Sequence, residues 1–244
     1  AVAVIQNSDV IYEKTFGYRD LEQQLPFTSD TLFPLASCSK SICALAIMTL
    51  VQDGKIGLHD PLSQYLDWWS PSTAPSFTIH QILSHSSGYP DLNASIEILR
   101  NRIMNPDHVH PLEDRSTFQK YMEQISSYPL FKPGERFIYN NDLYLLLGLL
   151  VEKITGESYS TYIQKRIFSP LHMTHSLLNG DQFKASSNRV QIYANPNGLE
   201  PPLRVNVPYF SLNGPAGGIF STLADLIRYI QFQLNPSDTK LLKS

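Results

Sequence analysis

Two segments of the chain are apolar on nearly every side, and each predicts a buried central helix. The first begins at Ser37, is apolar over much of 42–51 and stops at Gly54. The second runs from Asp142 to Lys153 and ends at Gly156. A helix with apolar residues around its whole circumference is enclosed by neighbouring elements, and glycine commonly lies just past a helix end.

The rest of the pattern mixes strands with shorter helices. Alternation over Ala1–Gln6, a turn cluster at 7–9 and the segment Val10–Phe16 predict a β-hairpin. Further elements are expected as helices at 78–83, 116–126 and 159–168, a strand at 189–194 and a turn at 195–198. A last helix starts at Thr222, where Asp225 is expected to complete a capping box.

Composition excludes several classes of protein. The 244 residues are 42% hydrophobic and 17% charged, which is typical of a folded domain rather than a disordered chain. No apolar run approaches the roughly 20 residues of a membrane-spanning helix, so no membrane segment is expected. The net charge of −3, without a basic stripe, argues against binding to nucleic acid.

The two cysteines, Cys38 and Cys43, lie on one predicted helix and face different sides, so they should not pair. Free thiols and the absence of a visible signal sequence favour a reducing, cytoplasmic compartment. The sequence shows no histidine context that would supply a base for Cys38. We therefore expect its thiol to be buried and to pack rather than react.

The segment Ser37-Cys38-Ser39-Lys40 is the first candidate for chemistry, an S-x-x-K pattern. A serine hydroxyl becomes a good nucleophile when a base takes its proton. Residues three apart on a helix share a face, so Lys40 can reach Ser37, and burial favours a neutral amine. Alone, the pattern more often marks a helix cap and a solvated lysine. A second match, at 237–240, precedes no long apolar helix and is interpreted as surface.

The segment Tyr139-Asn140-Asn141 is the second candidate, a Y-x-N pattern directly before the second buried helix. A phenol beside a lysine can relay a proton, and the amide of Asn141 could bind the acyl chain of a substrate. Alone, the pattern also fits a core tyrosine followed by a helix cap. Another match, at 193–195, lies at a strand end and not before a helix.

Other chemistry-bearing residues have simpler interpretations. The histidines lack HExxH or Cys-His zinc spacing and are expected to be surface or loop residues. The aromatic residues Tyr65, Trp68 and Trp69 could line a carbohydrate or peptide groove, although such residues more often pack in the core.

The order of the S-x-x-K and Y-x-N motifs along the chain, the spacing between them and the segments that flank them together form a more specific pattern than either motif alone. With these flanks the chain resembles the serine beta-lactamase-like superfamily, in particular its class C beta-lactamase, D-alanyl-D-alanine carboxypeptidase and esterase branch. The resemblance covers almost the whole chain and is carried by Leu35–Lys40, Asp53–Pro61, His85–Gly88, Lys132–Asn141, Ser169–Met173 and Ala216–Thr222.

The resemblance implies an α/β (α+β) fold. An antiparallel sheet flanked by helices would pack against a mostly helical lobe, with the active site between them. It also implies that Ser37 attacks a carbonyl to form an acyl-enzyme while Lys40 and Tyr139 shuttle the proton. Asn141 would hold the acyl side chain, and the backbone N–H of Ser37 would form half of the oxyanion hole.

The implied partner is a small-molecule or peptide substrate: a beta-lactam, a D-amino-acid peptide or a short-chain ester. No metal or organic cofactor is implied, and the oligomeric state stays open.

The family's third motif, K-T-G or H-x-G on a strand, is not found in residues 1–244. The segment Lys153-Ile154-Thr155-Gly156 is a near miss at a predicted helix end. In relatives this motif lies downstream of the segment matching 217–222. We therefore expect the chain to be truncated at both ends, and its single beta-lactamase-like domain, 1–244, to lack Ser37-dependent activity on its own.

The missing motif also supports an alternative, a non-catalytic binding or structural homologue of the penicillin-binding fold. A reading frame that continues past Ser244 into K-T-G or H-x-G would favour the enzyme. A metal-dependent hydrolase is a distant third hypothesis, which metal analysis would test.

Overall fold

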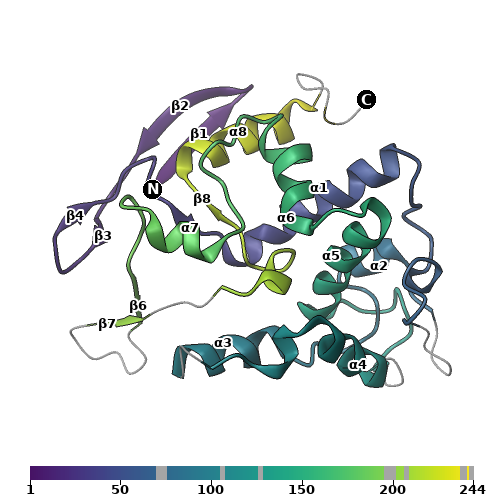
Figure 1. The fold of residues 1–244 in the computed structure, drawn as a ribbon. Coiled ribbons are helices and arrows are strands. Elements are labelled where there is room, and N and C mark those ends of the chain that lie inside the picture. Colours follow the sequence, from purple (N-terminus) through teal and green to yellow (C-terminus); the bar gives the residue numbers. More distant parts are fainter. Residues whose placement is uncertain are drawn as a thin grey trace.

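A computed structural model describes residues 1–69, 76–104, 108–125, 129–194, 202–205, 209–236 and 241. The expected mixed α/β class is confirmed. Among these residues the strands form four separate two-stranded antiparallel sheets, rather than one continuous sheet. The sheets lie toward the left and top of Figure 1, together with helices α7 (Gly180–Ala185) and α8 (Leu223–Leu234). The helices from α2 (Ile79–Leu83) to α5 (Asp142–Thr155) gather at its bottom and right. The expected turn at 195–198 and the second S-x-x-K match at 237–240 lie outside the described residues.

The strands are short. They pair as follows: β1 (Val2–Gln6) with β2 (Asp9–Lys14), β3 (Tyr18–Asp20) with β4 (Leu25–Pro26), β5 (Phe33–Pro34) with β8 (Phe220–Ser221), and β6 (Ile192–Ala194) with β7 (Leu203–Val205). The predicted hairpin is confirmed as β1 and β2, with Asn7 and Ser8 at positive φ in its turn. Helix α8 packs against β1.

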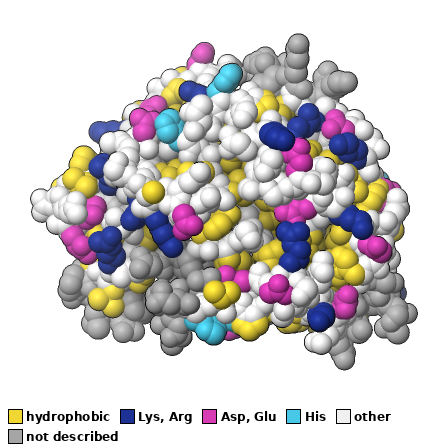
Figure 2. Space-filling model, in the orientation of Figure 1, with side chains coloured by type: hydrophobic (Ala, Val, Ile, Leu, Met, Phe, Trp, Pro, Cys, Tyr) yellow, Lys and Arg dark blue, Asp and Glu magenta, His cyan; other side chains and the backbone are white. Residues whose placement is uncertain are grey.

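The helices are α1 (Ser39–Gln52), α2 (Ile79–Leu83), α3 (Ala94–Met104), α4 (Arg115–Ile125), α5 (Asp142–Thr155), α6 (Tyr159–Ile163), α7 (Gly180–Ala185) and α8 (Leu223–Leu234). No helix in the described ranges is both long and apolar enough to cross a membrane. On the face shown in Figure 2, basic and acidic side chains are interspersed with hydrophobic ones.

Helices α1 and α5 pack against each other at the centre of the molecule (Figure 1). Their apolar side chains are almost completely enclosed, among them Ile47, Leu50, Leu146, Leu147 and Leu150. This confirms the two central helices expected from their all-round apolar pattern. Gly54 and Gly156, both at positive φ, lie just past the two helix ends.

The structure corrects the predicted start of the first helix. Ser37 lies in a 3₁₀ turn, Ala36–Cys38, and the α-helix itself begins two residues later at Ser39. The neighbouring backbone is tied to β8: the Leu35 N–H donates to the Ile219 carbonyl at 2.8 Å, and the Ile219 N–H donates to Ser39 Oγ at 3.2 Å. Ser37 is therefore exposed on a tight turn whose two sides are both anchored.

One further local prediction is wrong in part. Thr222 caps α8 by accepting from the Asp225 N–H at 3.2 Å, but no reciprocal capping box forms. The buried Asp225 carboxylate instead accepts from the His175 N–H and the Ser176 hydroxyl, both at 2.8 Å. The helix predicted over 159–168 is confirmed: it is α-helical as far as Ile163 and continues as a π-helical turn over Gln164–Phe168.

The cysteine prediction holds only in part. Both thiols are free, and Cys43 is the buried one, where burial raises the pKa of its thiol to about 12. Cys38 is exposed, because it belongs to the 3₁₀ turn and not to the enclosed helix. Trp69 is a core residue, only 1% exposed, which agrees with the packing interpretation.

Candidate active site

Lys40 brings three segments of the chain together. Its side chain, on the first turn of α1, is only 6% exposed. Its Nζ donates to Asn141 Oδ1 at 2.8 Å and to the Ala216 carbonyl at 2.7 Å, and lies 3.5 Å from Ser37 Oγ. The predicted pairing of Ser37 with Lys40 is therefore present, with the serine at the long end of hydrogen-bonding range.

Asn141 and Tyr139 occupy the same site in different ways. The turn that they form precedes α5, and Asn141 reaches Lys40 with its amide oxygen. Tyr139 presents its ring, whose centroid lies 4.8 Å from Lys40 Nζ, in a cation–π arrangement. Among the described residues no hydrogen bond joins the Tyr139 hydroxyl to Ser37. The structure thus brings all four predicted site residues together, with Tyr139 in contact with Lys40 through its ring.

His85 is a residue of this site to which the sequence assigned no role. Its ring lies between the rings of Tyr139 and Tyr144, at centroid distances of 4.4 and 5.0 Å. Nδ1 accepts from the Asn140 N–H at 3.1 Å, so the ring is neutral and carries its proton on Nε2. The pKa of His85 is lowered from its usual 6.5 to about 4, mainly by burial and also by the Lys40 charge, while the Asp91 charge opposes the shift.

This lowered pKa predicts a loss of stability in acid. As the pH falls below 6.5 the unfolded chain takes up a proton at His85 before the folded chain does, so the stabilising contribution is full above 6.5 and lost toward pH 4. We expect urea unfolding at pH 7 and pH 5 to show a larger drop for the wild type than for His85→Asn.

Asparagine is the matched replacement because it cannot titrate, keeps an acceptor near the Nδ1 position and tolerates the positive φ of 54° at this residue. An equal drop in the two proteins would mean that His85 does not carry the proton linkage.

A cavity of about 550 Å³ opens at Ser37. Asn141 and the segment Ala216–Gly218 form part of its wall, and most of the remainder is apolar or aromatic: Pro34, Ala36, Ile96, Val190, Ile192, Tyr193, Tyr209 and Phe220. Tyr193, from the other Y-x-N match, lines the cavity, but its hydroxyl is turned to the Leu21 N–H at 3.1 Å. It therefore does not replace Tyr139 beside Lys40.

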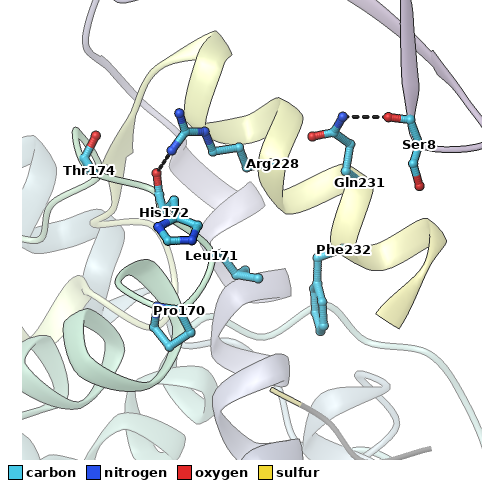
Figure 3. A pocket seen from close by; sticks show the side chains of 8 residues that line it. All are labelled: Ser8, Pro170, Leu171, His172, Thr174, Arg228, Gln231 and Phe232. Atoms are coloured by element: carbon cyan, nitrogen blue, oxygen red, sulfur yellow. Dashed lines mark hydrogen bonds between the residues drawn. The ribbon is translucent and has the colours of Figure 1, made fainter. Parts of the chain in front are cut away.

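A second cavity, of about 660 Å³, lies between the β1–β2 turn, the segment after Phe168 and α8 (Figure 3). Its polar groups are used in structural bonds: Arg228 donates to the His172 carbonyl, and Gln231 Nε2 donates to the Ser8 carbonyl at 2.6 Å. None of the described residues that line this cavity is a lysine that could activate a serine. The site at Ser37 is therefore the better candidate for chemistry, although its cavity is the smaller one.

Sequence reasoning could not find two contributors to this site. The Ala216 acceptor is a backbone carbonyl, which every residue carries. Asp91, whose Oδ2 accepts from Asn141 Nδ2 at 2.7 Å, lies in a polar stretch without a motif. The segment His85–Gly88, which carries part of the family resemblance, is the one signal in the sequence that points to His85.

The family model described as Beta-lactamase matches residues 1–243. Protein flp of Staphylococcus aureus (strain NCTC 8325 / PS 47) is 29% identical over 245 residues, covering 98% of this chain and 46% of its own length. Penicillin-binding protein 4* of Bacillus subtilis (strain 168) is 31% identical over 197 residues, covering 79% of this chain and 40% of its own length. The chain thus spans about half the length of the curated relatives that it matches.

Solved structures agree with this grouping. The octameric penicillin-binding protein homologue from Pyrococcus abyssi has a TM-score of 0.83 and 32% identity, covering 94% of this chain and 51% of that one. FmtA from Staphylococcus aureus has a TM-score of 0.76 and shares the fold at 23% identity, covering 95% of this chain and 60% of that one.

Proposed function

The chain belongs to the Beta-lactamase family, and on that premise we propose that it is a serine hydrolase working through an acyl-enzyme on Ser37. The observation that carries the proposal is the environment of Lys40 Nζ. Among the described residues, this buried nitrogen lies within hydrogen-bonding distance of two carbonyl oxygens and of the Ser37 hydroxyl. An ordinary solvated lysine has no such set of partners.

The proposed reaction follows from this arrangement. Ser37 Oγ forms a bond to the carbonyl carbon of the substrate while its proton passes to the neutral Lys40 amine. Collapse of the tetrahedral intermediate breaks the bond to the leaving group, which takes up that proton. Water then attacks the acyl-enzyme, with the proton again passing through Lys40, and Ser37 is released. The Tyr139 ring lies beside Lys40 Nζ, the atom that takes up and returns the proton in these transfers.

The substrate remains a choice among a beta-lactam, a D-amino-acid peptide and a short-chain ester. The apolar wall of the 550 Å³ cavity fits the uncharged acyl part of any of these. The amide of Asn141, which also lines the cavity, is placed to contact an acyl side chain.

We expect a fluorescent phosphonate to label the protein that carries these residues, as expressed from its full reading frame. Mass spectrometry should place the adduct on the peptide that contains Ser37, and Ser37→Ala should abolish it. A fluorescent penicillin in a parallel reaction reports the substrate class, because labelling by both probes favours a penicillin-recognising enzyme and labelling by the phosphonate alone favours an esterase.

Other outcomes would contradict the proposal. An adduct at Ser86, Ser87 or Cys38 would mean that the nucleophile is misassigned. A folded protein that neither probe labels would be a non-catalytic homologue that keeps the fold for binding.

A further inference from the structure

The loop that follows α2, here called the 85–91 loop, holds the Tyr139–Asn141 turn at successive points. The Ile138 N–H donates to the His85 carbonyl at 2.7 Å, one residue before the turn. The Asn140 N–H donates to His85 Nδ1 at 3.1 Å, and its amide Nδ2 donates to the Pro90 carbonyl at 2.8 Å. Asn141 Nδ2 donates to Asp91 Oδ2 at 2.7 Å. The turn that reaches Lys40 is therefore built against this loop.

Two charged groups determine which way the Asn141 amide faces. While it is an ammonium group, Lys40 has only hydrogen-bond donors and therefore faces the oxygen Oδ1. When Lys40 is neutral it can also accept a hydrogen bond, and the Asp91 carboxylate then keeps Oδ1 turned toward it. An ionised carboxylate only accepts them, so Asp91 requires the nitrogen Nδ2. A flipped amide would place its NH₂ group against the ammonium and its oxygen against the carboxylate. The observed orientation of the Asn141 amide is thus favoured both by Lys40 and by Asp91.

This orientation matters for the direction of the Lys40 lone pair. A neutral amine has two N–H bonds and one lone pair, arranged tetrahedrally with the bond to Cε. Asn141 Oδ1 and the Ala216 carbonyl, at 2.8 and 2.7 Å, accept the two N–H bonds. The remaining direction, toward Ser37 Oγ at 3.5 Å, is then left for the lone pair.

We propose that Asp91 is a positioning residue for this site: it holds the Asn141 amide so that the neutral Lys40 directs its lone pair at Ser37. The inference rests on the proposed acyl-enzyme function. Asp91 is itself held in place, because its Oδ1 accepts from the Asn93 N–H at 3.1 Å just before α3. It acts on the reaction only through Asn141 and Lys40.

The test uses a small alkyl fluorophosphonate on the protein expressed from its full reading frame. Ser37 Oγ bonds to phosphorus, fluoride leaves, and the serine proton passes to Lys40. We expect Asp91→Leu to lower the maximal rate of this reaction about 10- to 100-fold, the range of a hydrogen bond to a charged group. The half-saturating concentration should stay within about twofold, because the probe has no acyl amide for Asn141 to bind.

Two variants separate positioning from folding. Asp91→Asn keeps an acceptor oxygen for Asn141 and should recover the rate to within about tenfold of the wild type. Asp67→Leu removes a carboxylate whose side chain is 81% exposed and which pairs with Lys153 at the surface, and it should leave the rate unchanged. Urea unfolding of each variant reports any loss of structure.

A crystal structure of Asp91→Leu gives a readout that does not depend on activity. We expect the Asn141 amide to have moved away from Lys40 Nζ. Unchanged geometry, or equal rates for wild type and Asp91→Leu, would overturn the positioning role while leaving the nucleophile assignment intact. Absence of Ser37-dependent labelling in the wild type would instead overturn the proposed function, and the positioning role with it.

Discussion

A Lys40→Met variant is expected to react with a phosphonate at Ser37 about 10²–10⁴ times more slowly than the wild type, the range for loss of a general base. Methionine matches the length of the lysine stem and packs well in apolar surroundings, and Lys40 is only 6% exposed. The substitution therefore removes the base while keeping most of the packing. The measurement is the rate constant of labelling, followed by gel fluorescence.

A Tyr139→Phe variant supplies the comparison. It keeps the ring that lies 4.8 Å from Lys40 Nζ and removes only the hydroxyl. If Lys40 is the base, Tyr139→Phe should cost far less than Lys40→Met. The reverse order would make the tyrosine hydroxyl the base and Lys40 its electrostatic partner. Lys153→Met, at a side chain that is 53% exposed, controls for the loss of a lysine as such.

The central part of the site could be predicted because it depends on short-range pattern. The helices that carry or follow the two motifs are visible as largely hydrophobic segments, and Ser37 and Lys40 lie one turn apart. The approach of Asn141 to Lys40 is a long-range contact, and it was expected only through the resemblance to a family. Physical reasoning from spacing alone leaves both motifs with simpler interpretations.

The rest of the site could not be predicted because its partners have no local signature. Asp91 is an ordinary polar residue until the fold places it 2.7 Å from Asn141. The Ala216 contribution is a main-chain carbonyl, and the neutral state of His85 follows from burial between two tyrosine rings. Each of these properties arises from packing between segments distant in sequence, which hydrophobic periodicity does not encode.

The errors in the local predictions have the same origin. The S-x-x-K spacing suggested a helix from Ser37 onward, yet the chain takes a 3₁₀ turn there, which leaves Cys38 exposed. Asp225 has the spacing of a capping box, but its carboxylate finds donors on the His175–Ser176 segment instead. In each case a tertiary contact outweighs a weak local preference.

A Gly88→Ala variant should be strongly destabilised, because Gly88 meets two separate constraints within the 85–91 loop. Its φ is +84°, which costs a non-glycine residue about 1–2 kcal/mol. An added Cβ would also lie 2.2 Å from the Phe131 carbonyl oxygen, so the two backbones must separate. With an overpacking cost of about 1–3 kcal/mol, we expect a total loss of about 2–5 kcal/mol in urea unfolding.

Gly54→Ala is the matched control for this prediction. Gly54 has a similar φ of +67°, but a Cβ there would meet nothing within 4 Å, so only the backbone cost of about 1–2 kcal/mol applies. The difference between the two variants then measures the close approach of the 85–91 loop to the segment before Tyr139. Because this approach sets the position of Asn141, Gly88→Ala should also slow labelling of Ser37 under conditions where it remains folded, and Gly54→Ala should not. Equal losses of stability in the two variants would mean that the 85–91 loop can move to accommodate the added Cβ, and that it does not hold the Tyr139–Asn141 turn rigidly.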